Sequence, residues 1–339
     1  MTPAPHAPTR TPLAAAGPSR PLTGRPRALL LEGVHPEAAA LLHRAGFDVD
    51  DHRGALGEDA LIAAIRGVQV LGIRSRTRVS RRVLHAAGDL QAVGAFCTGT
   101  DQIDLQAATE RGVAVFNAPH ANGRSVAELA LAEVIALTRR LPERNAAAHA
   151  GVWDKSATGS HEVRGRCLGI VGYGAIGTQL SVLAEALGMD VVFHDLAERA
   201  PVGRARRCET LHELLVQADA VSLHVDGRPQ NAGLIGEAQL AAMRPGSVLL
   251  NLSRGSVVDL AALRRHLTSG HLAGAAIDVF PDEPSAAGRP FTNPLRGLPN
   301  VLLTPHVGGS TQEAQREIAV SVANRLVSHA RTTTTARAA

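Results

Sequence analysis

The chain has 339 residues, of which 45% are hydrophobic and 19% are charged, so it is long and apolar enough for two globular domains. A formal net charge of only +4 and an aromatic content of 2% argue against a nucleic-acid-binding surface, and no apolar run is long enough to span a membrane. Three cysteines without metal-ligand spacing predict reduced thiols in a cytoplasmic protein that binds no metal. These are Cys97, Cys167 and Cys208.

The first 26 residues have a composition of their own, with several arginines, seven prolines and no acidic residue. Arginine without acid is typical of an organellar transit peptide, but the prolines would break the amphipathic helix that such a peptide needs. We therefore expect residues 1–26 to be a disordered extension. The tail at residues 331–339, which is rich in Thr, Ala and Arg, is expected to be disordered as well.

Structured sequence begins at Arg27, and strands then alternate with helices. Short apolar runs predict strands at 28–31, 47–50, 68–73, 90–96 and 113–116. Helical spacing, closed by glycine, predicts helices at 36–45, 58–66, 80–88 and 104–111. Such alternation predicts a parallel sheet that is covered by helices on both faces.

A helical stretch from Asn122 to about Ala150, with Pro142 as the expected break, separates this series from a second one. The second series has strands expected at 168–171, 191–194, 220–224, 248–251, 274–279 and 301–303. It is typical of a complete dinucleotide-binding fold. A last helical stretch at about 311–330 precedes no third unit, so we expect it to pack back on the first unit and make that unit discontinuous.

A glycine-rich sequence stands between the first strand of the second series and the helix-compatible run Thr178–Leu187. It reads Gly172-Tyr-Gly174-Ala-Ile-Gly177 and matches G-x-G-x-x-G. The three glycines permit a sharp turn, close approach to a pyrophosphate and tight helix–strand packing, and the helix N-terminus attracts the phosphates. Asp195 ends the next strand, where a carboxylate can accept hydrogen bonds from the adenosine ribose and repel a 2′-phosphate. This favours NAD over NADP; the plainer alternative is that Asp195 caps a turn.

Three further stretches resemble the D-isomer-specific 2-hydroxyacid dehydrogenases in their order and spacing, namely Asn251–Asp259, Ala276–Pro284 and Leu303–Ser310. Other stretches look closer to the bacterial D-3-phosphoglycerate dehydrogenases, among them Gly72–Thr77, Phe116–Pro119, Arg124–Glu128, Gly151–Lys155 and Ser310–Ala314. The likeness runs from about residue 28 to residue 328. It implies NAD-dependent oxidation of D-3-phosphoglycerate to 3-phosphohydroxypyruvate, the first step of serine biosynthesis.

The resemblance also implies an α/β fold of two domains. A Rossmann-type doubly wound parallel sheet at 122–308 is expected to bind NAD. It is inserted in a discontinuous, flavodoxin-like substrate domain at 27–121 and 309–330, with the active site in the cleft between the domains.

The resemblance assigns catalysis to three residues. His306 resembles the acid/base, because imidazole titrates in the useful pH range. Glu283 resembles the carboxylate that fixes the imidazole tautomer, and Arg254 resembles the cation that grips the substrate carboxylate. Taken without the family, each has a plainer interpretation: a turn histidine beside Pro305, a loop acid, and a surface arginine that begins a helix.

The same resemblance assigns the binding residues. Cofactor contacts are expected at the glycine turn, at the end of the next strand and in the three family stretches: Gly172, Gly174, Ala175, Ile176, Gly177, Asp195, Leu252, Ser253, Arg254, Asp278, His306, Gly308 and Gly309. Substrate contacts are expected at Arg74, Ser75, Asn122, Lys155 and Arg53. Any one of these last residues taken singly has a solvated polar side chain as its plainer interpretation.

Three positions depart from the family pattern, and the chain ends where the bacterial enzymes begin a small regulatory domain. Asp226 stands where proline is common, Leu252 where alanine is usual, and His120 where the residue is often aromatic. We expect no feedback by serine through that domain and no tetramer built through it. A homodimer formed through the cofactor domains is expected instead.

Two alternative functions remain open from the sequence. The chain could be a dehydrogenase for another D-2-hydroxy acid such as 2-hydroxyglutarate, for instance in specialised metabolism. It could also be a non-catalytic scaffold that senses NAD, since transcriptional corepressors share this fold and can retain the His–Glu–Arg set. A turnover assay separates the two, because a scaffold would form no NADH with any 2-hydroxy acid.

Overall fold

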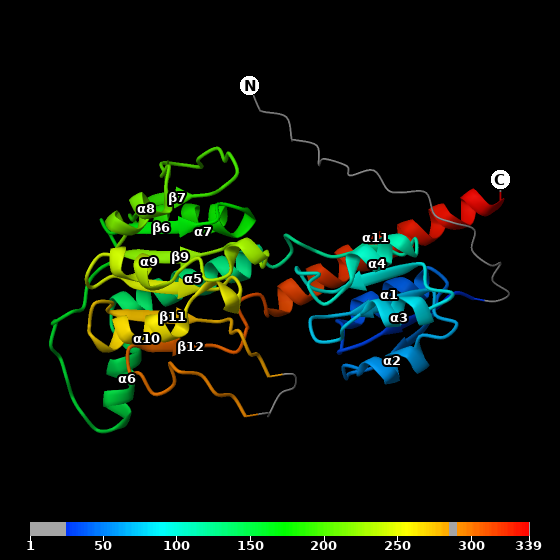
Figure 1. Cartoon of the computed structure of the whole chain (residues 1–339), viewed down its shortest axis with the longest axis horizontal. Helices are drawn as coiled ribbons and strands as arrows, with labels where there is room; N and C mark the ends of the chain where they lie inside the picture. The colour runs from blue at the N-terminus through cyan, green and yellow to red at the C-terminus, as the bar shows by residue number, and fades with distance from the viewer. Residues whose placement is uncertain (1–24, 285–289, 339) are drawn as a thin grey trace. The chain divides into compact units, whose positions relative to one another are not determined.

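The computed structural model describes residues 25–284 and 290–338, and it divides into two compact units (Figure 1). Unit 1 contains the described residues up to Pro119 and those from Gln315 onward, and unit 2 contains His120–Ala314. Most of the expected disordered extension, residues 1–24, lies outside the described residues. In the part of the chain that the structure describes, no helix has the length and apolar character of a membrane span.

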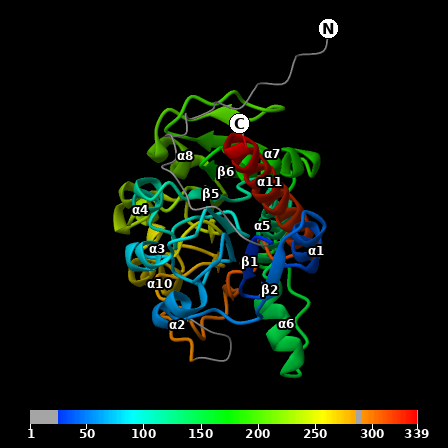
Figure 2. The same ribbon diagram turned by 90° about the vertical axis from the view of Figure 1, so that its right-hand side faces the viewer.

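Unit 1 is built on a parallel sheet of five strands in the order β2-β1-β3-β4-β5, which is the flavodoxin-like order. Its strands are β1 (Arg27–Leu30), β2 (Asp48–Asp51), β3 (Val70–Ile73), β4 (Ala92–Ala95) and β5 (Ala114–Phe116). Its helices are α1 (Pro36–Arg44), α2 (Glu58–Ala64), α3 (Arg81–Ala86), α4 (Leu105–Glu110) and most of α11 (Gln312–Ala338). Figure 2 shows α2, α3 and α4 on one side of this sheet and α1 and α11 on the other.

Helix α11 packs closely on β4 because Gly94 has no side chain. A Cβ atom at Gly94 would lie 2.8 Å from Leu326 and 2.9 Å from Val322, both on α11. The expected return of the last helix to the first unit is therefore found. In the structure α11 continues through the expected disordered tail to Ala338. Neither glycine nor proline interrupts the run, and its alanines and arginines favour helix, whereas its four threonines do not.

Unit 2 is built on a parallel sheet of seven strands in the order β12-β11-β10-β9-β6-β7-β8. These strands are β6 (Cys167–Val171), β7 (Asp190–His194), β8 (Arg206–Arg207), β9 (Ala220–Leu223), β10 (Val248–Asn251), β11 (Gly274–Ile277) and β12 (Val301–Leu303). Read from β8 inward, this is the Rossmann order with one added strand at the far edge. The expected α/β class with a Rossmann-type sheet is confirmed.

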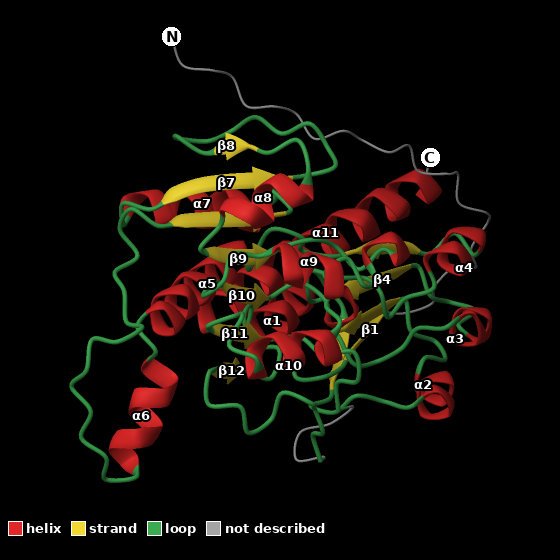
Figure 3. Ribbon diagram, turned by 60° about the vertical axis from the view of Figure 1, so that its left-hand side comes forward, coloured by secondary structure: helices red, strands yellow, loops and turns green. Residues whose placement is uncertain are grey.

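Helices cover both faces of this sheet (Figure 3). One face carries α5 (Gly123–Thr138) and α7 (Ala175–Ala186), which bury residues such as Val126, Ala130 and Leu180. The other carries α8 (Leu211–Gln217), α9 (Glu237–Ala242) and α10 (Leu260–Thr268), with two 3₁₀ turns, η1 (Pro229–Asn231) and η2 (Gly255–Val257). Helix α6 (Leu141–His149) projects from this layer and buries no side chain.

Local boundaries differ from the expected ones for physical reasons. The break expected at Pro142 lies at residues 139–140, because proline is tolerated in the first turn of the following helix. The two units were expected to meet at 121/122 and 308/309, but they divide at 119/120 and 314/315. Residues just beyond 308 stay with unit 2, since the Thr311 hydroxyl lies 2.8 Å from that of Ser125 on α5.

Candidate active site

The glycine-rich turn joins β6 to α7 at the point where the strand order of unit 2 reverses. Gly172 has a φ of +92°, a left-handed conformation that side chains rarely adopt. A Cβ atom there would lie 2.7 Å from the carbonyl oxygen of His224, and one at Gly177 would overlap the carbonyl oxygen of Gly172. These two glycines are therefore required by packing between strand, turn and helix.

Gly174 has a different role. It is the N-cap of α7, makes no side-chain capping bond, and a Cβ atom added there would meet nothing within 4 Å. The first N–H groups of α7, from Ala175 and Ile176, therefore begin a helix beside open space. Free N–H groups and the helix dipole at such a place attract a phosphate.

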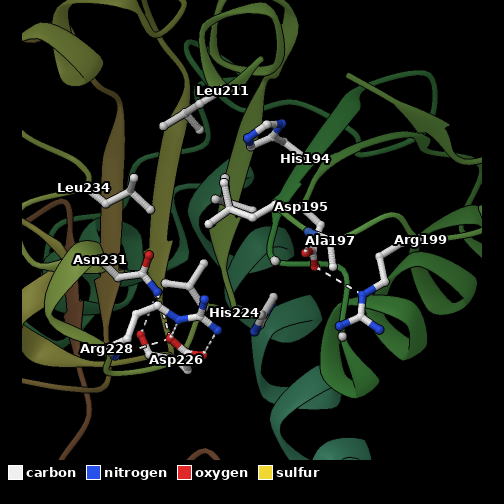
Figure 4. Close-up of a pocket in the computed structure, with 15 residues that line it drawn as sticks. His194, Asp195, Ala197, Arg199, Leu211, His224, Asp226, Arg228, Asn231 and Leu234 are labelled. Carbon is white, nitrogen blue, oxygen red and sulfur yellow. Dashed lines mark hydrogen bonds and ion pairs between the residues drawn. The ribbon is translucent and has the colours of Figure 1, made fainter. Parts of the chain in front are cut away.

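A cavity of about 290 Å³ opens beside this turn, at the carboxyl ends of β6, β7 and β9 (Figure 4). Asp195 lines it, and its side chain is 15% exposed. The carboxylate accepts hydrogen bonds from the N–H of Tyr173 in the glycine turn and of Ala197, each at 2.8 Å. Arg199 lies 3.6 Å away. Asp195 therefore does cap a turn, and it also presents a carboxylate in the cavity wall.

His224 lines the same cavity, and sequence reasoning placed it only as the end of a strand. Its Nε2 lies 2.9 Å from the Ser222 hydroxyl, and its buried Nδ1 has no hydrogen-bond partner among the described residues. Burial lowers the pKa of His224 to about 4, so the ring is neutral at pH 7. A buried polar atom without a partner is costly, and a polar ligand in the cavity could supply one. With the open glycine turn, this fits a dinucleotide.

Asp226, which stands where the family commonly has proline, stiffens the lip of this cavity. Its carboxylate accepts from Arg228 Nε at 2.7 Å and from Asn231 Nδ2 at 2.9 Å. Figure 4 shows this network on one side of the cavity and the Asp195–Arg199 pair on the other. A side-chain network thus fixes a backbone that proline would otherwise restrict.

The His306 imidazole is paired with a carboxylate on a neighbouring loop. Both oxygens of Glu283 lie 2.9 Å from His306 Nδ1, which leaves Nε2 for other chemistry. The hydrogen bond to Glu283 raises the pKa of His306 above its ordinary value. Burial pushes the pKa of Glu283 upward, but the bond to His306 and nearby positive charge outweigh it, so that pKa is lowered. Each partner stabilises the charged form of the other.

Arg254 follows β10 and lies close enough for its charge to lower the pKa of both Glu283 and His306. Gly255 explains this approach. A Cβ atom at Gly255 would overlap the backbone of Phe280, so only glycine lets the β10 loop meet the loop that carries Glu283. Arg254, Glu283 and His306 are thus brought together by loops at the ends of β10, β11 and β12, on one edge of the sheet.

Asp278 holds the His306 loop through its carboxylate and its backbone carbonyl. The residue is 2% exposed, and its carboxylate accepts from the Thr304 hydroxyl at 2.6 Å and from the N–H groups of Val307 and Gly308 at 2.8 Å each. His306 itself has a φ of +55°, and its N–H donates to the Asp278 carbonyl at 2.8 Å. The described contacts of this expected cofactor residue therefore serve to orient His306.

Other expected cofactor and substrate residues of unit 2 gather around this loop, with one exception. Leu252 is buried beside Gly308, and Ser253 is buried and bonded to Asn251. The Asn122 side chain packs so closely on Gly309 that a Cβ atom there would overlap it. Lys155 is not among them: it is exposed in the segment after α6 and makes no hydrogen bond or ion pair with any described residue.

The other expected substrate residues belong to unit 1. Arg53 follows β2, and Arg74 and Ser75 follow β3, so all three lie at the carboxyl edge of its parallel sheet. Neither guanidinium makes an ion pair with another residue in the described part of the chain. The carboxyl edge of an open parallel sheet is where such folds bind ligands.

Comparison with known proteins gives the family. Residues 131–308 match the D-isomer specific 2-hydroxyacid dehydrogenase, NAD binding domain. The chain is 52% identical over 302 residues to D-3-phosphoglycerate dehydrogenase of Escherichia coli, covering 89% of this chain and 74% of that protein. Identity to the D-3-phosphoglycerate dehydrogenase of Dictyostelium discoideum is 48% over 299 residues, covering 88% and 74%.

Solved structures agree with these sequence relatives. The TT0316 protein from Thermus thermophilus superimposes with a TM-score of 0.82 at 33% identity, covering 90% of this chain and 97% of that one. The chain therefore belongs to the D-isomer-specific 2-hydroxyacid dehydrogenases and is an NAD-dependent oxidoreductase.

Proposed function

We propose that the protein oxidises D-3-phosphoglycerate at its C2 hydroxyl, using NAD. The observation that carries the chemistry is the His306–Glu283 pair with Arg254 beside it, on the edge of the sheet that also holds the glycine turn. The choice of substrate is supported by the 52% identity to a D-3-phosphoglycerate dehydrogenase and by Arg53 and Arg74 at the carboxyl edge of the unit 1 sheet.

The residues that would hold NAD lie along the carboxyl edge of unit 2. Ala175 and Ile176 would give backbone N–H groups to the pyrophosphate, while Asp195 would meet the adenosine ribose and His224 would form a polar contact in the same cavity. Leu252, Ser253, Asp278, Gly308 and Gly309 would complete the site. Bound NAD would supply the acceptor for the C2 hydrogen and its electron pair.

The chain's own residues carry the proton and the charge. His306 Nε2 would take the hydroxyl proton, since Nδ1 is held by Glu283. Glu283 stabilises the imidazolium that this step creates and keeps the ring in one orientation. Arg254 would hold the substrate carboxylate through a two-point hydrogen bond and polarise the oxygen at C2.

The charged ends of the substrate need further cations and donors. Arg53, Arg74 and Ser75 in unit 1 and Asn122 and Lys155 in unit 2 would share this role. Asn122 has a side-chain oxygen that is buried without a partner among the described residues, so it too has capacity for a ligand. Two guanidinium groups suit a substrate that carries both a carboxylate and a phosphate.

The test is the formation of NADH with D-3-phosphoglycerate, D-2-hydroxyglutarate, D-lactate and D-glycerate, compared by kcat/KM. We expect D-3-phosphoglycerate to give the highest value, and Arg74→Ala to lower kcat/KM for it more than for D-lactate, which has no phosphate. A preference for 2-hydroxyglutarate would contradict the proposed substrate but would still agree with the proposed reaction class. No turnover with any acid would favour a scaffold that senses NAD.

The proposal includes a homodimer formed through unit 2. Leu141 on α6 and Val152 and Trp153 just after it are 47%, 55% and 86% exposed, and no residue of α6 is fully buried. Large apolar side chains in this number are typical of an interface, and a second copy of the chain offers the same surface in return. Sedimentation equilibrium should give a dimer that Trp153→Asp weakens. A monomeric parent protein would refute this.

A further inference from the structure

Glu32 follows β1 and is unusual in two respects. Its φ is +68°, although it is not glycine, and its side chain is 2% exposed, although it carries a carboxylate. A left-handed backbone and a buried acid each cost stability, and both persist only where surrounding contacts hold them. The mechanism above does not use Glu32.

The Glu32 carboxylate binds the loop that carries Arg74 and Ser75. Its Oε1 accepts from the N–H of Arg74 at 3.2 Å and of Thr77 at 2.8 Å, and its Oε2 accepts from the N–H of Arg76 at 3.0 Å. Three backbone donors of a four-residue loop are therefore directed at one buried carboxylate. Hydrogen bonds to an ionised acceptor are about twice as strong as neutral ones, so the loop is ordered without a ligand.

The backbone at Glu32 also binds the loop that carries Arg53. The N–H of Glu32 donates to the Gly54 carbonyl at 3.0 Å, and that of Gly33 donates to the His52 carbonyl at 3.1 Å. Strand β1 lies between β2 and β3 in the sheet. Glu32, just after β1, thus holds the loops that follow both of the strands next to β1.

These contacts separate the roles of the arginines. Arg76 Nε lies 3.6 Å from Glu32 Oε2, so its charge is partly balanced by that carboxylate. Arg74 and Arg53 make no such pair with any residue that the structure describes. Glu32 occupies the backbone N–H groups of Arg74, Arg76 and Thr77, so within this loop an anion is left the side chains and the N–H of Ser75.

We propose that Glu32 is a positioning residue for substrate binding: it holds the 52–54 and 74–77 loops so that Arg53 and Arg74 are ordered for the anionic ends of the substrate before it binds. This rests on the proposed function in that it takes Arg53 and Arg74 to contact the substrate. Order established before binding removes the entropy cost of fixing the two loops in the complex.

Two variants and a matched control test this role. Glu32→Gln keeps the shape of the side chain but turns an amide donor toward backbone donors, and Glu32→Gly keeps the left-handed backbone while removing the carboxylate. Glu37→Gln removes a half-buried acid on the neighbouring α1, whose carboxylate pairs, among the described residues, only with Arg44 at 3.4 Å. Each is compared with the parent full-length protein.

Two measurements are made on each variant. Hydrogen exchange followed by mass spectrometry reports on the amides of residues 73–78, and kinetics give KM and kcat for D-3-phosphoglycerate, with NADH affinity measured by fluorescence. We expect faster exchange at 73–78 in both Glu32 variants and a KM raised by roughly tenfold or more, since a charge-assisted bond is lost. We expect kcat and NADH affinity within about twofold of the parent, because those reside in unit 2, and no change in Glu37→Gln.

The outcomes separate this inference from the proposed function. Unchanged exchange at 73–78 would overturn the role of Glu32 in holding the loop, and faster exchange with an unchanged KM would overturn its role in binding. Parallel losses of KM, kcat and NADH affinity would mean a general structural role and would also overturn it. If the substrate panel selects another acid, the proposed substrate fails, and the same KM comparison with that acid still decides the role of Glu32.

Discussion

Both carboxylate oxygens of Glu283 lie 2.9 Å from Nδ1 of His306, and the pKa of His306 is raised by this bond. The pair binds a proton on imidazole more firmly than free histidine does. It therefore makes His306 a stronger base for oxidation and a ready proton donor for the reverse reaction.

Replacing His306 should remove chemistry and spare cofactor binding. We expect His306→Ala to lower kcat by about 10²–10⁴-fold, the usual contribution of a general base, with the Kd for NADH changed only slightly. Single-turnover kinetics and fluorescence titration measure the two quantities separately. An equal loss in both would assign His306 a structural role instead.

The rate of oxidation should depend on the ionisation of His306. Only the neutral imidazole can take a proton, so kcat/KM for oxidation rises as the pH passes upward through the pKa of His306, which the bond to Glu283 raises above its ordinary value. In Glu283→Gln the imidazolium loses its partner, the pKa falls, and the ascending limb of the profile moves to lower pH while kcat drops. A limb that stays in place would show that another group controls the profile.

Asp195 should discriminate between the two dinucleotides. Removing its carboxylate takes away a repulsive charge and leaves Arg199 without its partner at 3.6 Å, which favours a 2′-phosphate. We expect Asp195→Ala to reduce the preference for NAD over NADP by roughly ten- to hundredfold. The double variant Asp195→Ala/Arg199→Ala should show little of the increased use of NADP that Asp195→Ala shows. An unchanged preference in the single variant would refute this assignment.

The Asp278 carboxylate should contribute strongly to the stability of unit 2. In Asp278→Ala the Thr304 hydroxyl and two backbone N–H groups lose their acceptor in a buried place, which should cost about 3 kcal/mol. Thr304→Val removes one of these bonds and should cost about 1 kcal/mol. Urea unfolding followed by circular dichroism makes the comparison. Equal losses for the two variants would contradict the proposed support of the loop.

The glycines of the turn should separate folding from cofactor binding. A Cβ atom at Gly177 would overlap the Gly172 carbonyl, so Gly177→Ala should destabilise the protein by about 1–3 kcal/mol. A Cβ atom at Gly174 meets nothing in the protein, so Gly174→Ala should fold normally and raise the Kd for NADH. Thermal unfolding and NADH titration distinguish these results. Normal NADH affinity in Gly174→Ala would mean that the pyrophosphate binds elsewhere.

Much of the fold could be predicted because its signals are local. Apolar runs and closing glycines predicted the central strands, such as β10, within a residue or two. The two-residue strand β8 was missed because Arg206–Arg207 has no apolar pattern and lies at the edge of the sheet, where it pairs only with β7. The continuation of α11 into the expected disordered tail was not predicted, because composition does not report a helix that extends beyond its packed part.

The candidate site was predictable only where residues form a motif. His306, Glu283 and Arg254 stand in recognisable stretches, but their approach depends on Gly255 meeting the backbone of Phe280, which is a tertiary contact. Glu32 and His224 carry no motif. Glu32 stands out by its burial and its left-handed φ, and His224 by a buried Nδ1 that has no hydrogen-bond partner among the described residues. Sequence alone reports none of these features. A polar residue ending an apolar parallel strand is the one signal that could have drawn attention to them.

Unit 1 is made of chain segments that precede and follow unit 2, and this has a consequence for biosynthesis. A ribosome completes β1 to β5 and then all of unit 2 before α11 emerges, so the part of the sheet around Gly94 that Val322 and Leu326 cover stays uncovered throughout that interval. The growing polypeptide therefore carries an uncovered apolar surface while its middle portion is already able to fold. Shielding by a chaperone, or fast elongation, would matter most during this interval.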